Sequence, residues 1–179
     1  MQADRLLIRP EKLEDLPEIR EVNRLAFGRA EEAELVDRLR AEGDALISLV
    51  AEGKPGRLDG HILFSPLPIT RPDGAVLTGA ALAPVAVRPE RQNQGIGGAL
   101  VRAGIAACRE VSVDVVVVLG HPAYYPRFGF SAERARNLEA PFSGPPFMAL
   151  ELRPGCLDGP RGKVRYARAF GLDEHKEAR

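Results

Sequence analysis

The sequence predicts a mixed α+β protein, and three observations lead to that class. Short apolar runs of strand length recur along the 179 residues, from residues 6–10 to residues 115–119. Two stretches near the N-terminus repeat apolar residues at helical spacing. An apolar run at 82–87, a helical pattern at 97–111 and the run at 115–119 then follow in the order of a strand–helix–strand crossover. We therefore expect a mixed, largely antiparallel sheet flanked by helices.

The first third of the chain predicts a strand, two helices and a second strand. LLIRP at residues 6–10 is typical of a strand, and apolar residues then recur every three or four positions over 13–27. A second helix is predicted over 33–40 and ends near Gly43, and residues 46–52 again have strand character. The charges between these apolar positions indicate two amphipathic helices with solvated outer faces.

The middle of the chain predicts strands joined by tight turns. KPGRLDG at residues 54–60 is a polar turn, and strand material follows at 61–66 and 67–70. RPDG at 71–74 is a turn signal that precedes the strand at 82–87. These strands are therefore expected to be linked mostly by hairpins.

Composition and charge restrict the class of protein. We expect one domain over residues 4–170 and a C-terminal tail at 171–179. Lys plus Arg and Asp plus Glu both number 25, which gives no overall charge that would favour nucleic acid or an anionic membrane. Cys108 and Cys156 lack metal-ligand spacing, and no signal peptide or membrane span is recognised. We expect a cytoplasmic protein with reduced thiols, Cys108 in the core, and no metal.

A charged turn and a glycine cluster follow the strand at 82–87. A helix that begins at Gly97 would leave its first N–H groups without partners, and its dipole would add positive charge there, so this end attracts phosphate. Gly95, Gly97 and Gly98 would let a large anion approach the main chain closely. Longer side chains that would add charge and hydrogen bonds are Arg88, Arg91 and Gln92.

Two familiar phosphate-binding motifs fit this spacing badly. A Walker A loop ends in Gly-Lys-Ser/Thr, whereas Gly97 is followed by Gly98, Ala99 and Leu100. A dinucleotide fingerprint would need glycine or alanine in place of Leu100 and would begin directly at the end of its strand, but RPERQN intervenes. Both motifs are therefore set aside.

What this segment resembles is the acetyl-CoA signature of the GCN5-related N-acetyltransferases (GNAT): Gln or Arg, two residues, Gly, one residue, Gly or Ala. Gln92-Asn93-Gln94-Gly95-Ile96-Gly97 matches it fully. Residues 124–130, YYPRFGF, are similar to the family's later motif, in which a tyrosine precedes a Gly-Phe pair. Together the motifs most resemble the bacterial YhbS-like subgroup, over residues 6–170. The resemblance implies the GNAT fold, with two strands splayed at the coenzyme site, and acetyl-CoA as co-substrate.

The resemblance also implies roles for individual residues. Pro84 removes a ladder donor where the family splays its strands. The backbone of Val85, Ala86 and Val87 would hold the pantetheine arm, with one amide polarising the thioester carbonyl. Tyr125 would contact the coenzyme and protonate the departing thiolate, and Tyr124 is its alternative. The turn that would bind the pyrophosphate comprises Arg91, Gln92, Asn93, Gln94, Gly95, Ile96, Gly97 and Gly98.

The general base and the acceptor site stay open at this point. The segment GAALAPV, at residues 79–85, contains no acidic residue that could act as the general base. The remaining candidates for the base are Glu52, His61 and His121, acting directly or through water. His121 is favoured because it lies between the strand at 115–119 and the tyrosine motif. The acceptor site is expected near the first two helices and the late strands, with residues 141–147 at its rim and a set of aromatic side chains: Phe27, Phe64, Phe142 and Phe147.

The sequence thus favours an N-acetyltransferase that moves an acetyl group from acetyl-CoA to an amine of a small molecule or protein, by direct attack through a tetrahedral intermediate. One alternative is a non-catalytic module that binds an acyl-CoA and reports it to a partner. Another is an acyltransferase with a different acyl donor or a hydroxyl acceptor. Dimers are common in the family, so a homodimer is among the states to test.

Overall fold

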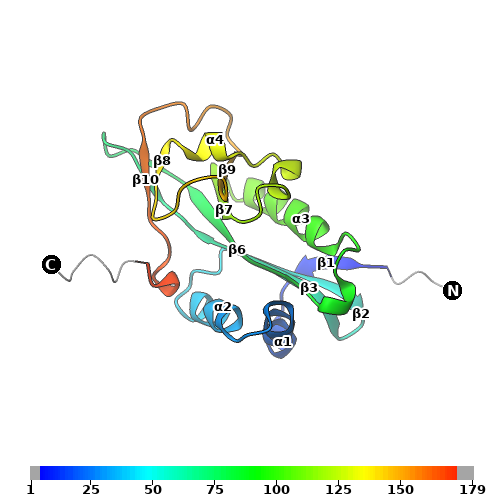
Figure 1. The fold of residues 1–179 in the computed structure, drawn as a ribbon. Helices are drawn as coiled ribbons and strands as arrows, with labels where there is room; N and C mark the ends of the chain where they lie inside the picture. The colour runs from blue at the N-terminus through cyan, green and yellow to red at the C-terminus, as the bar shows by residue number, and fades with distance from the viewer. Residues whose placement is uncertain (1–4, 173–179) are drawn as a thin grey trace. The chain divides into compact units, whose positions relative to one another are not determined.

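The computed structural model describes residues 5–172, so most of the expected tail, residues 173–179, lies outside the described residues. The chain forms two compact units (Figure 1). Unit 1 comprises the chain up to residue 64 together with residues 83–107, and unit 2 comprises residues 65–82 and the chain from 108 onward. The expectation of one domain over residues 4–170 stays a prediction.

Unit 1 has a sheet covered by helices on both faces. Its strands follow the order β1-β2-β3-β6, and β2 pairs antiparallel with both β1 and β3. Helices α1 and α2 lie side by side in Figure 1. The elements, some of which extend into unit 2, are β1 (Leu7–Pro10), a 3-10 turn (Leu13–Asp15), α1 (Leu16–Phe27), α2 (Glu31–Ala41), β2 (Ile47–Lys54), β3 (Arg57–Pro66), β6 (Gly79–Val87), a 3-10 turn (Pro89–Arg91) and α3 (Ile96–Glu110).

Neighbouring residues of β3 show which helix covers which face of that sheet. The His61 side chain contacts Asn23 of α1. On the other face, a Cβ atom placed on Gly60 would lie 2.9 Å from Leu100 Cδ1 and 3.2 Å from Ile96 Cγ2. Glycine at position 60 therefore allows α3 to pack closely against the strand, and this packing positions the start of α3.

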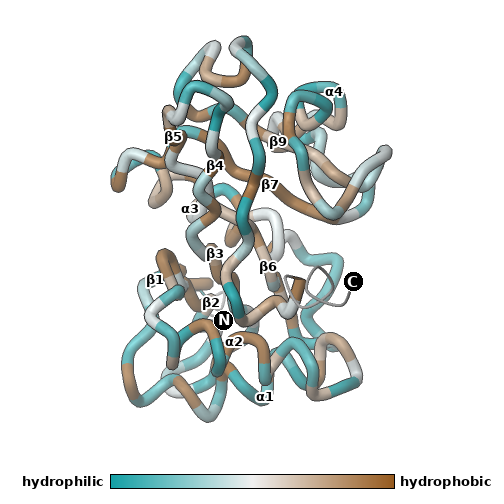
Figure 2. Tube along the Cα trace, turned by 90° about the vertical axis from the view of Figure 1, so that its left-hand side faces the viewer, coloured by the Kyte–Doolittle hydropathy of each residue, from teal (hydrophilic) through white to brown (hydrophobic). Residues whose placement is uncertain are grey.

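Unit 2 contains two sheets. The first has the order β6-β7-β9, with β6 parallel and β9 antiparallel to β7, and β7 is hydrophobic throughout in Figure 2. The second has the order β5-β4-β10-β8. The elements are β4 (Ile69–Thr70), β5 (Val76–Leu77), β7 (Val115–Leu119), a 3-10 turn (Tyr125–Phe128), α4 (Ala132–Ala135), β8 (Leu138–Glu139), β9 (Phe147–Glu151), β10 (Gly162–Val164) and a 3-10 turn (Arg168–Phe170).

One apolar cluster joins both sheets of unit 2. Val115 and Val117 of β7 belong to it, together with Ile69 of β4, Leu138 of β8 and Val164 of β10. All are less than a tenth exposed, so the second sheet is stabilised by burying one face against the first. Among the described residues, no helix is long and apolar enough to cross a membrane, and no group of His, Cys, Asp and Glu is arranged to hold a metal ion.

The α+β class is confirmed, and most predicted elements are found within a few residues. Two boundaries were wrong: β3 begins at Arg57, inside the expected polar turn over 54–60, and β6 begins at Gly79. Asp59 explains the first error, because this charged residue is 4% exposed yet paired with arginine inside a strand. The second sheet was not predicted, since each of its four strands has only two or three residues.

Candidate functional site

The glycine turn of unit 1 connects β6 to α3 in the geometry that exposes main-chain N–H groups. Asn93 and Gly95 have positive φ values of 59° and 84°. The first helical hydrogen bond runs from the Ala99 N–H to the Gly95 carbonyl, at 3.0 Å. The N–H groups of residues 96–98 precede it and have no partner within the helix. A 15-residue helix thus presents its positive end at the predicted anion-binding turn.

Two glutamines brace this turn. Gln92 Nε2 donates to the Val87 carbonyl at 3.1 Å, and Gln94 Nε2 donates to the Glu90 carbonyl at 3.2 Å. Both side chains and Asn93 remain exposed. The signature residues therefore fix the backbone of the turn while leaving its outer surface open.

The two arginines of the turn have different environments. Arg88 is buried, where it donates to the Leu58 carbonyl at 2.6 Å and to Glu18 at 2.8 Å, so it holds the fold together instead of facing a ligand. Arg91 Nε lies 3.1 Å from the buried carboxylate of Asp59, and the Arg91 side chain is 31% exposed. Of the two, Arg91 retains surface that an anion can reach.

Strand β6 changes its pairing where the sequence predicts an irregularity. The ladder between β6 and β7 runs from Gly79 to Leu82 and ends there, directly before the cis Ala83–Pro84 peptide bond. Beyond Pro84, Ala86 is buried and Val85 and Val87 are half-buried. The segment proposed for the pantetheine arm therefore begins where that ladder ends.

Tyr125 of unit 2 is 7% exposed and is held by aromatic contacts. Its ring centroid lies 5.2 Å from that of Tyr124 and 5.7 Å from that of Phe130, both edge to face. A Cβ atom on Gly120 would lie 2.3 Å from Tyr125 Cε2, so the ring rests on that glycine. The Tyr125 hydroxyl makes no hydrogen bond to another described residue. Burial, with a smaller effect of Tyr124, raises the pKa of Tyr125 to about 12, which keeps the phenol protonated at neutral pH.

His121 occupies the start of the loop that carries this tyrosine. Its carbonyl accepts hydrogen bonds from the N–H groups of Tyr124 and Tyr125, at 3.0 and 3.3 Å. Its side chain is exposed. The imidazole is thus free to meet a substrate or water, while the backbone of His121 positions the tyrosine loop.

His61 is excluded as a solvent-accessible base because it is fully buried beneath α1. Asn23 Nδ2 lies 3.1 Å from Nδ1, and Ser48 Oγ lies 2.9 Å from Nε2. Asn23 also donates to the Ile19 carbonyl, which is consistent with Nδ1 accepting and Nε2–H donating to Ser48. Burial lowers the pKa of His61 to about 4, so the ring is neutral near pH 7.

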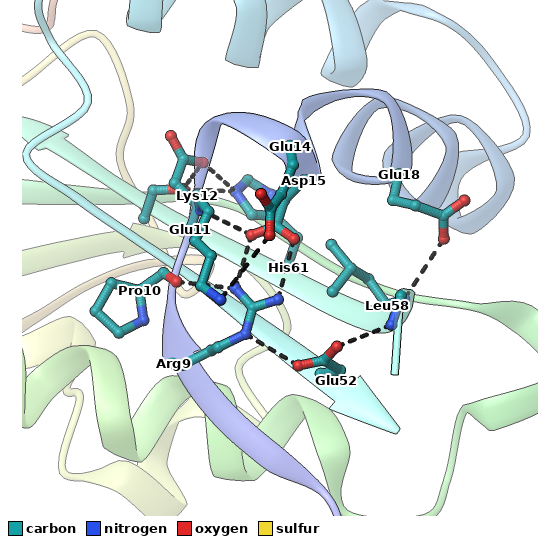
Figure 3. A network of polar contacts seen from close by, with 12 residues as sticks. Arg9, Pro10, Glu11, Lys12, Glu14, Asp15, Glu18, Glu52, Leu58 and His61 are labelled. Atoms are coloured by element: carbon teal, nitrogen blue, oxygen red, sulfur yellow. Dashed lines mark hydrogen bonds and ion pairs between the residues drawn. The ribbon is translucent and has the colours of Figure 1, made fainter. Parts of the chain in front are cut away.

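Glu52 is likewise committed to the fold, as Figure 3 shows. Arg9 lies between two carboxylates, with its Nε 3.0 Å from Glu52 and its Nη1 2.7 Å from Asp15. The Gly56 N–H and Arg9 hold the pKa of Glu52 below its usual range. The guanidinium of Arg9 similarly lowers the pKa of Asp15. Among residues 5–172, His121 is the one of the three base candidates that neither forms a structural ion pair nor is buried.

The aromatic residues assigned to the acceptor site divide by burial. Phe64 and Phe147 are core residues at 0% and 3% exposure, and Phe142 is partly buried against the unit 2 cluster. Phe27 is 39% exposed at the end of α1. Phe64 is therefore removed from the expected ligand contacts, because it offers no surface to an acceptor, whereas Phe142 and Phe147 line a cavity of unit 2.

Three positioning residues were missed from the sequence: Asp59, Glu18 and Gly120. Asp59 and Glu18 hold the arginines of the turn, and Gly120 supports Tyr125. The role of Asp59 was missed because the polar residues around it are typical of a loop. The role of Gly120 could have been predicted, since a glycine directly after a buried strand often indicates that another group packs closely against the backbone.

Comparison with protein families places the chain in a known group. Residues 7–132 match the model of the acetyltransferase (GNAT) domain. The uncharacterized N-acetyltransferase YhbS of Escherichia coli (strain K12) is 34% identical over 167 residues, which cover 92% of this chain and 98% of the relative. The uncharacterized N-acetyltransferase YjhQ of the same strain is 43% identical over 118 residues, or 65% of this chain and 64% of YjhQ.

Solved structures agree with this assignment. A GNAT family acetyltransferase from Brucella melitensis, in complex with acetyl-CoA, is 40% identical with a TM-score of 0.77, over 93% of this chain and 99% of that chain. YhbS from Escherichia coli, in complex with CoA, is 34% identical with a TM-score of 0.86, over 96% of this chain and 94% of that chain. Both similar structures thus contain the coenzyme or its acetylated form.

Proposed function

Because the chain belongs to the GNAT family of acetyltransferases, we propose that it transfers the acetyl group of acetyl-CoA to an amine of a small molecule or protein. The observation that carries this proposal is the turn over residues 92–98. It combines the family signature with exposed side chains, positive φ values and the first N–H groups of α3. The CoA and acetyl-CoA complexes of the similar proteins support the same choice of co-substrate.

The proposed coenzyme contacts come from two parts of unit 1. The N–H groups of residues 96–98 would bind the pyrophosphate, assisted by Arg91 and by the exposed side chains of the turn. The backbone of residues 85–87 would hold the pantetheine arm as an added strand would be held. An N–H group of Val85 or Val87 aimed at the thioester oxygen would stabilise the charge that develops there.

Tyr125 is proposed as the general acid. In the transfer, the amine nitrogen forms a bond to the acetyl carbon, the carbon–sulfur bond breaks, and Tyr125 donates its proton to the departing thiolate. Its high pKa ensures that this proton is present at neutral pH, and its hydroxyl has no competing partner among the described residues. Replacing it with phenylalanine removes the proton while retaining the ring.

His121 is the candidate base, acting on the amine directly or through water. Its exposed side chain supports this role, because Glu52 and His61 are held in the fold by Arg9 and by burial. A protein that binds acyl-CoA without turnover is the second candidate. The absence of an acidic residue from β6 favours it, because no carboxylate in that strand can serve as the base.

Calorimetric titration with acetyl-CoA and desulfo-CoA tests the proposal. Gly97→Glu would place a carboxylate at the turn, and we expect it to weaken binding of both ligands at least about 100-fold. Ala106→Glu adds the same charge at an exposed position of α3 and should leave binding unchanged. If the folded parent binds neither ligand, both the transferase and the sensor are rejected.

Turnover distinguishes the two candidates that share this binding site. With a panel of amines, a transferase releases free thiol, and we expect Tyr125→Phe to lower kcat about 100-fold while it still binds acetyl-CoA. Binding without thiol release on any amine would favour the sensor. An unchanged kcat in Tyr125→Phe would remove the tyrosine from the mechanism.

A further inference from the structure

Unit 2 contains a cavity of about 350 Å³, which we call the arginine pocket. None of the residues proposed to bind the coenzyme or to act as acid or base lines it, although it includes part of the segment 141–147 that the sequence assigned to the acceptor rim. Its walls are largely apolar: Leu138 and Phe147 are each 3% exposed, and Phe142 is partly buried against the same cluster. The volume is within the range of small-molecule sites. The walls therefore suit the hydrocarbon part of a small ligand.

Two arginines, Arg136 and Arg161, also line this cavity. Strands β8 and β10 run parallel, with Gly162 opposite Leu138, and the Gly162 N–H donates to the Asn137 carbonyl at 3.1 Å. Arg136 directly precedes Asn137, and Arg161 directly precedes Gly162. The fold thus brings the two arginines to the same end of adjacent strands, at one pocket.

Both guanidinium groups are exposed and lack an ionic partner among residues 5–172. Neighbouring Arg134 shows the contrast, because its Nη1 lies 3.0 Å from Glu151 and 2.8 Å from Asp158. Glu151 and Asp158 are therefore engaged by Arg134. Arg136 and Arg161 are left to add positive charge at the mouth of an apolar cavity.

A larger cavity of unit 2, of about 690 Å³, differs from the arginine pocket in the charges that line it. The larger cavity is lined by charges of both signs, and Lys163 stands directly opposite Glu139 in the sheet. Among the described residues, the arginine pocket is lined by two cations and no carboxylate. Of these two cavities, the smaller one combines apolar walls with positive charge that no described lining carboxylate offsets.

We propose that the arginine pocket binds a small organic carboxylate with an aromatic or branched aliphatic body. The carboxylate would accept hydrogen bonds from Arg136 and Arg161, whose planar guanidinium groups suit paired contacts with carboxylate oxygens. The body would lie against Phe142, Phe147 and Leu138. This binding site requires neither acetyl-CoA nor acetyl transfer.

Titration of the full chain with phenylacetate, followed by NMR, tests this site. We expect a dissociation constant of about 1 mM or tighter, which is appropriate for a ligand of this size. 2-Phenylethanol has the same ring without the charge, and inorganic phosphate has the charge without the ring. Both should bind at least about tenfold more weakly, because each loses one half of the recognition.

Matched variants assign the binding to the pocket. Arg136→Gln and Arg161→Gln should each weaken phenylacetate binding about tenfold or more, whereas Arg109→Gln removes an exposed arginine outside the pocket and should have no effect. All three positions are exposed, so folding should be retained, which a circular dichroism melt checks. The proposal is overturned if phenylacetate does not bind, if phenylethanol or phosphate binds as tightly, or if the Arg136→Gln, Arg161→Gln double variant binds normally.

Discussion

The two units of this protein are stabilised by different chemistry. Among the described residues, five of the six buried polar or charged side chains belong to unit 1: Asp15, Asn23, Asp59, His61 and Arg88. Unit 2 is built on an apolar cluster and on edge-to-face rings, such as Tyr125 with Phe130 at 5.7 Å and Phe142 with Tyr166 at 5.6 Å.

This difference matches what each unit has to position. The turn of unit 1 would bind phosphate through backbone N–H groups, and its loops are held at fixed directions by ion pairs and hydrogen bonds, such as Arg88 with Glu18. Unit 2 would position one phenol, for which packing around the ring suffices. We therefore expect the stability of unit 1 to depend mainly on pH, and the stability of unit 2 to depend mainly on the volume of its buried side chains.

The largest expected effect is from Phe147→Ala, which removes a ring that is 3% exposed from the cluster of unit 2. The free energy of unfolding should fall by about 3–5 kcal/mol, from lost transfer energy and the cavity left behind. Urea unfolding at pH 7 and pH 5 measures it, and the loss should be the same at both because the ring does not titrate. A loss under about 1 kcal/mol would show that this apolar cluster is not what stabilises unit 2.

A smaller effect is expected in unit 1 from the titration of His61. Its pKa is about 4 in the fold and near 6.5 in the unfolded chain, so between these values the unfolded chain binds more protons. The stabilisation is complete above about pH 6.5 and decreases as the pH falls toward 4, by up to about 3 kcal/mol. Stability measured across this range should decrease accordingly.

His61→Gln isolates this contribution, because glutamine can still donate to Ser48 but does not titrate. Glu11 and Asp15 also have lowered pKa values, but they are present in both proteins and act mainly at lower pH. The dependence on pH between 6.5 and 5 should therefore flatten in the variant. An equal slope in both proteins would assign the pH dependence to groups other than His61.

The sequence predicted those elements that a short run of consecutive residues is enough to define. Residues 115–119 form β7 with the expected bounds, since five consecutive apolar residues indicate a buried strand without further information. Helix α3 begins at Ile96, one residue before the expected Gly97. The glycine turn was likewise recognisable, because its chemistry depends on consecutive residues.

Pairings between distant residues were not predictable in the same way. Asp59 was assigned to a turn because its partner, Arg91, is 32 positions away in the sequence, and only the pairing with this arginine makes burial of the Asp59 charge tolerable. The sequence makes His61 a candidate base, and the structure instead places it in a buried network with Asn23 and Ser48. Sequence patterns give residue types, whereas burial and partners arise only when the chain folds.

Gly120→Ala should cost about 1–3 kcal/mol, because the added methyl group meets the Tyr125 ring at 2.3 Å and the ring must move. Movement of the hydroxyl should lower kcat more than it changes the affinity for acetyl-CoA, since the turn that would bind the pyrophosphate is in unit 1. In a Tyr125→Phe background, Gly120→Ala should lower kcat little further. Additive losses in kcat would separate Gly120 from the role of the tyrosine.

The smallest effect concerns the two thiols, which both lie in unit 2 and report on its opening. Cys108 is 0% exposed and Cys156 3%, and burial raises the pKa of both, that of Cys108 to about 12. A thiol reagent at pH 8 should therefore modify them only as fast as unit 2 opens. Cys108→Ser and Cys156→Ser assign each rate to one thiol.

These rates also test whether the two units open independently. Phe147→Ala should accelerate labelling because it loosens the cluster that contains Cys156, whereas His61→Gln should leave the rate nearly unchanged at pH 8, where the imidazole is neutral in the folded and unfolded chain. Equal acceleration by both variants would mean that the thiols become accessible through opening of the whole chain. The two units would then be stabilised by different interactions but would unfold together, with one free energy of unfolding for the whole chain.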